Sequence, residues 1–144
     1  MPEDETSNRG TAYTRTSLWG FIPMPYLAAT LGYCVFLYYL SSVSSFPVDP
    51  PFEYFDKLVH FCLYSGLTAV VAVGLQQARH KYSAKMLIMI PVAFSALYGV
   101  TDEVHQLFVP SRTFAPGDML ADAFGALAAA VLLLLVYRWR RLQK

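Results

Sequence analysis

Side chains suited to proton transfer recur at helical spacing in one short segment of this sequence. Asp56, His60 and Tyr64 follow one another at intervals of four residues, and Lys57 lies beside the first of them. This spacing places side chains on one face of an α-helix. A histidine changes charge near neutral pH, and a neighbouring carboxylate can orient it as a general acid or base. The segment therefore carries the groups that acid–base chemistry requires.

A second segment combines carboxylates, a histidine and an arginine. Asp102 shares a helix face with His105 and Gln106, and Glu103 lies on the adjacent face. Arg112 follows in the connection to the next segment. A guanidinium group binds phosphate or carboxylate through two parallel hydrogen bonds. This segment therefore adds anion-binding capacity to a possible acid–base site.

A third segment begins with carboxylates and continues with small residues. Asp118 and Asp122 are again four residues apart, and Gly125 continues their face, where it permits close helix packing. Structural roles stay open for several of these groups. Asp56 and Asp118 could cap helices and interact with the helix dipole, and histidines could form hydrogen bonds between helices. Three segments thus turn carboxylates toward a common region.

The composition indicates that lipid, rather than water, surrounds much of the protein. Hydrophobic residues make up 56% of the chain and charged residues 15%, against about 45–50% and about 25% in typical soluble domains. A helix of about 20 apolar residues crosses a hydrocarbon core of about 30 Å. Segments of this kind occur at residues 21–40, 56–76, 85–106 and 118–137. We therefore expect an all-α fold, an integral membrane bundle of four transmembrane helices.

The charged residues predict how this bundle is oriented. Nine of the eleven Lys and Arg residues would lie at one end of it, and every acidic residue after the N-terminal tail would lie at the other. The positive-inside rule makes the basic end cytoplasmic. We predict a multi-pass protein of the plasma membrane, with both termini cytoplasmic and the polar segments on the extracytoplasmic face. Residues 1–20 are predicted to be a flexible tail, and residues 21–140 one transmembrane domain.

At these positions the sequence resembles the VanZ-like family of small membrane proteins. The residues that match its motifs are Asp56, Lys57, His60, Phe61 and Tyr64, then Tyr98, Gly99, Asp102, Glu103, Gln106, Phe108, Pro110 and Arg112, and finally Asp118, Asp122 and Gly125. The resemblance covers residues 20–140. It implies a role at the cell envelope, because the founding member is linked to teicoplanin resistance, and it implies no established reaction. Asp122 departs from the pattern, since Asn is common there.

The first functional hypothesis is a pocket on the outer face that binds an anionic molecule, lipid-linked or related to peptidoglycan. Such binding would affect susceptibility to teicoplanin. The expected ligand-binding residues are Asp56, Lys57, Tyr64, Gln106, Arg112, Asp118 and Asp122. Expected partners are membrane lipids and a lipid-linked cell-wall precursor or a glycopeptide. A homodimer is compatible with so small a bundle, whereas the net charge of +1 gives no support for nucleic-acid binding.

Other functions stay open. In a membrane-embedded hydrolase or transferase acting on a phosphate ester or lipid carrier, the catalytic residues would be His60, His105, Asp102 and Glu103. Clusters of His and carboxylate groups also form proton relays in transporters, although the apolar cytoplasmic halves of these segments offer no continuing chain. The same groups could hold a divalent metal, but no H-E-x-x-H or similar spacing occurs, so the cofactor is left unknown.

Overall fold

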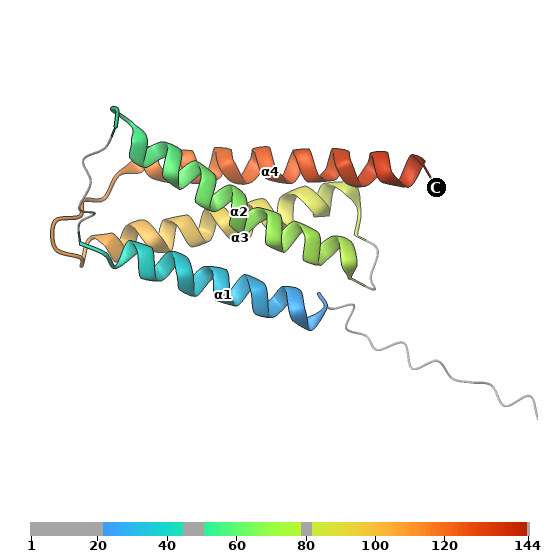
Figure 1. Ribbon diagram of the computed structural model, residues 1–144, viewed down its shortest axis with the longest axis horizontal. Helices are drawn as coiled ribbons and strands as arrows, with labels where there is room; N and C mark the ends of the chain where they lie inside the picture. The colour runs from blue at the N-terminus through green and yellow to red at the C-terminus, as the bar shows by residue number, and fades with distance from the viewer. Residues whose placement is uncertain (1–21, 45–50, 79–81, 144) are drawn as a thin grey trace, which may run out of the picture.

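The computed structural model describes residues 22–44, 51–78 and 82–143, and within these ranges the chain forms four α-helices. They are α1 (Met24–Ser41), α2 (Phe55–Gln77), α3 (Ala84–Gln106) and α4 (Pro116–Leu142). Each helix runs antiparallel to the helix before it (Figure 1). The predicted all-α class is therefore confirmed. The helix ends lie close to the predicted ones, except that α4 continues beyond residue 137. The predicted tail, residues 1–20, lies outside the described residues.

Short-range chemistry explains where the later helices begin. Ser83 precedes α3, and its side-chain oxygen accepts a hydrogen bond of 3.3 Å from the backbone N–H of Met86, which is the usual N-cap interaction. Pro116 begins α4, at a position where a missing N–H leaves no helical hydrogen bond unmade. Pro91 lies buried inside α3, where neighbouring helices in a membrane bundle let a proline be tolerated.

Three of the described helices, α2, α3 and α4, are long and apolar enough to cross a membrane. Large apolar side chains cover their outer faces: Leu97 is 68% exposed and Leu132 is 62% exposed. An extended apolar surface of this kind favours lipid as the surrounding medium. Helix α1 has 18 residues, four of them tyrosines, and it is not one of these three helices. A fourth span in α1 and cytoplasmic termini stay predictions.

Helices α2 and α3 form the centre of the bundle. Each packs against the other three described helices, and the most extensive contact is the one between α2 and α4. Gly125 of α4 lies directly against the backbone carbonyl of Phe61 in α2, so a Cβ atom at this position would collide with it. Ser65 of α2 donates a hydrogen bond of 2.9 Å to the carbonyl of Gly125. This close contact brings the first turns of α4 against the first half of α2.

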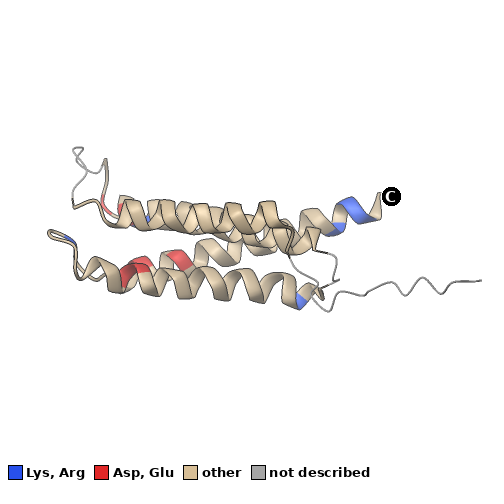
Figure 2. Ribbon diagram, turned by 90° about the horizontal axis from the view of Figure 1, so that it is seen from below, with Lys and Arg blue, Asp and Glu red and all other residues tan. Residues whose placement is uncertain are grey.

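The interior changes character along the bundle. Near the C-terminal ends of α2 and α4 the core is apolar. Its buried residues are Val71, Leu75, Leu87 and Leu134. At the opposite end the buried residues are Asp102, Glu103, Gln106, Asp118 and Asp122. These two regions are called the apolar end and the polar end below. Figure 2 shows acidic residues gathered at the end away from the C-terminus, and a basic segment beside the C-terminus itself.

Candidate functional site

His60 lies at the centre of the polar end, between two carboxylates of α4. Its Nδ1 is hydrogen bonded to Asp122 Oδ1 at 3.0 Å, and its Nε2 is 3.9 Å from Asp118 Oδ2. The imidazole is 13% exposed, and the Asp122 side chain is fully buried. Asp118 and Asp122 are one helical turn apart, so a single imidazole reaches both of them. Helices α2 and α4 thus bring one histidine and two predicted carboxylates together.

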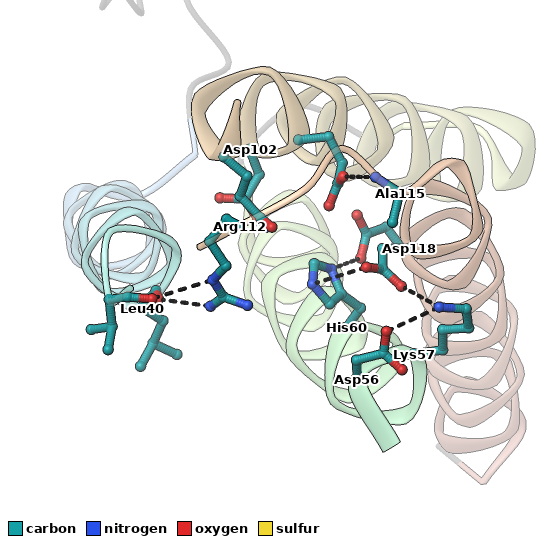
Figure 3. Close-up of polar contacts among 12 residues, drawn as sticks. Leu40, Asp56, Lys57, His60, Asp102, Arg112, Ala115 and Asp118 are labelled. Carbon is teal, nitrogen blue, oxygen red and sulfur yellow. Dashed lines mark hydrogen bonds and ion pairs between the residues drawn. The ribbon is translucent and has the colours of Figure 1, made fainter. Parts of the chain in front are cut away.

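Lys57 compensates part of this negative charge. Its Nζ lies 3.1 Å from Asp118 Oδ1 and 3.0 Å from Asp56 Oδ2 (Figure 3). Asp56 is exposed, whereas the Asp118 side chain is only 8% exposed. Because a buried carboxylate without a partner is costly, the ammonium group stabilises Asp118 where it lies. Among its described neighbours, Lys57 is thus engaged with carboxylates of the protein itself.

Glu103 approaches the same centre from α3. It is fully buried, and its Oε2 accepts a hydrogen bond of 2.8 Å from the backbone N–H of Ala115. Its other oxygen, Oε1, has no hydrogen-bond partner among the described residues. One carboxylate oxygen each from Glu103 and Asp118 and one ring nitrogen of His60 all lie within 4.8 Å of one another. These three groups, from α2, α3 and α4, have the chemistry to hold a metal ion.

Asp102 and Gln106 of α3 and Tyr64 of α2 also lie at the polar end. Gln106 Nε2 donates a hydrogen bond of 3.3 Å to Asp102 Oδ2, one turn away on the same helix. The buried Tyr64 ring lies parallel to the His60 ring, with ring centroids 6.1 Å apart. The sequence placed Asp102 and Gln106 on a common helix face, and in the structure both are buried there.

Arg112 lies on the connection between α3 and α4, and it also holds that connection to α1. Its Nε donates to the carbonyl of Val43 over 3.2 Å, and an Nη group donates to the carbonyl of Leu40 over 3.5 Å (Figure 3). Carbonyl groups at a helix C-terminus carry partial negative charge, which favours a cation there. The preceding residue, Ser111, has a φ of 67°, so the backbone turns sharply just before the guanidinium group.

His105 lies apart from His60, at the contact between α1 and α3. Its Nε2 is 3.1 Å from Ser42 Oγ, and its ring lies over Tyr38 with centroids 4.5 Å apart. It does not line the pocket at the polar end. The two histidines that the sequence proposed as catalytic groups therefore have different surroundings, and only His60 lies among buried carboxylates.

A pocket of about 840 Å³ opens at the polar end, between α1, α2 and the α3–α4 connection. Its polar lining includes seven predicted residues, which are Asp56, His60, Tyr64, Asp102, Gln106, Arg112 and Asp118. The apolar lining is Leu37, Leu40, Pro51, Phe55, Val59, Leu63 and Ala115, and Ser41, Ser111 and Thr113 complete it. The apolar wall was not predicted from the sequence. Leucine is also common on the lipid-facing surface of a membrane helix, so the sequence does not distinguish Leu37 and Leu40 as residues that line a pocket.

Comparison with known proteins gives one family. A family model described as VanZ/LLP1 matches residues 3–137, which include all three polar segments. No curated protein and no solved structure matches the chain.

Proposed function

The chain belongs to the VanZ/LLP1 family, and on that premise we propose that it is an envelope membrane protein that binds an anionic, lipid-linked molecule in the pocket at its polar end. The main observation in favour of this proposal is that the pocket lining combines a cationic side chain with apolar ones. Arg112 lines the same pocket as Leu37, Leu40 and Val59. A ligand with a charged head and a hydrocarbon chain is complementary to both kinds of surface.

The size of the pocket supports a ligand of this kind. Its volume of about 840 Å³ lies within the range of about 300–1,000 Å³ that is usual for small-molecule sites. Such sites combine mostly apolar walls with a few polar groups that orient the ligand. A phosphate or pyrophosphate headgroup with the first part of an isoprenoid or acyl chain fits that description. The rest of a long chain would continue into the surrounding membrane.

Arg112 is the group proposed to meet the headgroup. A guanidinium group stays charged at every physiological pH and presents its donors in a plane that matches phosphate or carboxylate. The hydrogen bonds to Leu40 and Val43 fix this side chain at the pocket wall, so little conformational entropy is lost when a ligand binds. Lys57 pairs with Asp56 and Asp118, and its proposed part is to neutralise those carboxylates beside the headgroup.

The proposal extends to the cell wall. If the polar end is extracytoplasmic, as the positive-inside rule predicts, the pocket faces the side of the membrane on which lipid-linked cell-wall precursors are used. Sequestering or presenting such a precursor would change the number of sites available to teicoplanin. Membrane lipids would compete for the same pocket.

The test compares a polyprenyl phosphate with the polyprenol of the same chain length, which differ only in the phosphate. Native mass spectrometry of the purified chain in detergent measures how much of each is retained. We expect wild type to retain the phosphate at least about 10-fold better, because hydrogen bonds to charged groups contribute about 1.5–3 kcal/mol. Arg112→Gln should lose this preference and still retain the alcohol, which shows that its pocket is intact.

Arg138→Gln is the matched control, since Arg138 lies near the C-terminal end of α4. It should retain the phosphate as well as wild type does. Equal retention of phosphate and alcohol by wild type would contradict the proposal, and so would an equal loss in Arg112→Gln and Arg138→Gln.

A second candidate function rests on the His60–Asp122 hydrogen bond. A buried carboxylate that orients an imidazole is the arrangement of a general base. In this version the pocket belongs to a hydrolase or transferase that acts on the phosphate ester. His60 would accept a proton from the water or alcohol that attacks phosphorus, the P–O bond to the polyprenyl chain would break to release polyprenol, and Arg112 would stabilise the charge that develops on the phosphate. Release of phosphate from the polyprenyl phosphate by wild type, and its loss in His60→Gln, would favour this candidate over simple binding.

A further inference from the structure

We propose that the polar end holds one divalent metal ion, with zinc best suited, between His60 Nε2 and the carboxylates of Glu103 and Asp118. These three groups come from α2, α3 and α4, and their ligand atoms lie within 4.8 Å of one another. The inference stands on this geometry, and it does not require the lipid-linked ligand proposed above.

The balance of charge at the polar end favours a cation. Within the described part of the chain, Lys57 pairs with Asp56 and Asp118, and neither Glu103 nor Asp122 has a Lys or Arg ion pair. Both of these side chains are fully buried. Glu103 Oε1 and Asp122 Oδ2 also have no hydrogen-bond partner in the described residues. Buried carboxylates with unsatisfied oxygens are costly, and a divalent cation would offset that cost directly.

Each proposed ligand residue is held through one polar atom and keeps a second polar atom available to bind a metal. A carboxylate accepts hydrogen bonds, so the contact of 3.0 Å with Asp122 places the hydrogen on Nδ1 of His60 and leaves Nε2 as a lone pair. Asp118 is held through Oδ1 by Lys57, and Glu103 is held through Oε2 by the Ala115 N–H. A histidine oriented by a carboxylate in this way is a recurrent feature of metal sites.

The distances suit two ligands of one ion better than a direct contact. His60 Nε2 and Asp118 Oδ2 are 3.9 Å apart, which is too long for a hydrogen bond. Tetrahedral zinc binds nitrogen and carboxylate oxygen at about 2.0–2.2 Å, which places two of its ligand atoms about 3.4 Å apart, so a small inward movement of these side chains would let both bind one ion. A cation between these two atoms would therefore give each of them a partner.

The mixture of ligands identifies the class of metal. One imidazole nitrogen with two carboxylates suits zinc, or manganese, better than magnesium or calcium, which prefer oxygen ligands alone. Three protein ligands leave a coordination position open, as in catalytic rather than structural zinc sites. His60 and Asp118 line the pocket, so that position would face a bound phosphate. A metal on Nε2 would also exclude His60 as a free general base.

The test uses the full chain in detergent after removal of metals with EDTA. Zn²⁺ binding is measured by titration calorimetry, stoichiometry by elemental mass spectrometry, and ligand type by the visible spectrum of bound Co²⁺. We expect one ion per chain, and a loss of at least about 10-fold in Zn²⁺ affinity in His60→Gln and in Glu103→Gln. The matched controls are His105→Gln and Glu53→Gln, whose side chains lie outside the cluster, and they should bind like wild type.

Two outcomes would overturn the proposal. One is the failure of wild type to bind an equivalent of Zn²⁺ or Co²⁺ at micromolar concentration, which does not depend on how any variant folds. The other is an equal loss of affinity in His60→Gln and His105→Gln. The polyprenyl phosphate assay measures a different quantity, so the metal site and the anionic ligand can each fail while the other stands.

Discussion

The apolar end and the polar end of this bundle are built from the same helices and meet opposite requirements. At the apolar end, Val71, Leu75 and Leu134 need only neighbours of suitable volume. At the polar end, each buried carboxylate needs a charge or a hydrogen-bond donor, and Glu103 and Asp122 each have an oxygen that lacks one among the described residues. A bundle that needed only to fold would be apolar throughout.

The contrast identifies the polar end as a region whose buried charges lower the stability of the fold. A charge near the centre of a membrane helix costs about 2.5–3.5 kcal/mol on insertion scales. The polar end gathers several carboxylates at helix ends, where that cost is smaller, and offsets part of it with Lys57. Groups that are both costly and preorganised are typical of functional sites. The pocket lies at the polar end, where the buried carboxylates are not needed for folding.

The largest expected effect comes from separating α2 and α4 where the polar end joins the rest of the bundle. In Gly125→Val the new side chain would collide with the backbone of Phe61. We expect the free energy of unfolding to fall by about 3 kcal/mol, because backbone cannot move aside as a flexible side chain can. The displacement should also part His60 from Asp122 and abolish Zn²⁺ binding. Thermal unfolding in detergent, followed by circular dichroism, measures the first effect.

Gly32→Val is the matched control, because a Cβ atom at Gly32 meets nothing within 4 Å. It should change the unfolding temperature little. Similar destabilisation by both substitutions would show that helix propensity, and not the contact between α2 and α4, determines the result.

A second substitution would change the charge of the polar end and leave its shape unchanged. Asp122→Asn keeps an oxygen that can accept the hydrogen bond from His60 Nδ1, and removes the negative charge. We expect the unfolding free energy to change by less than about 1 kcal/mol, and the affinity for Zn²⁺ to fall by about 10–100-fold, as for other residues that orient a metal ligand. Calorimetric titration with Zn²⁺ checks this. Unchanged affinity would remove Asp122 from the proposed site.

The smallest effect is expected between the two ends. Thr68 of α2 and Ser95 of α3 are fully buried, and the Thr68 hydroxyl donates a hydrogen bond of 2.7 Å to Ser95 Oγ. Such bonds between membrane helices contribute about 0.6 kcal/mol on average. A double-mutant cycle with Thr68→Val and Ser95→Ala should give that coupling and leave Zn²⁺ affinity unchanged. A coupling several times larger would mean that the polar region extends deeper than the pocket.

The helices were largely predictable from the sequence. Apolar stretches and polar breaks are local features, so they located α2 and α3 within one or two residues of their observed ends. The stripe of Asp56, His60 and Tyr64 was visible for the same reason, because spacing along a helix fixes which side chains share a face. The apolar wall of the pocket was not predictable, since leucines that face a pocket and leucines that face lipid have the same sequence pattern.

By itself, the sequence determined the four helices, the family and the set of polar residues at one end of the bundle. Only the tertiary structure decided which of these residues meet. Glu103 was assigned to a neighbouring stripe, yet it lies buried beside His60, whereas His105 contacts α1. The reason is physical. Periodicity fixes directions within one helix, but the rotation of each helix about its axis depends on packing, here on the contact between Gly125 and Phe61.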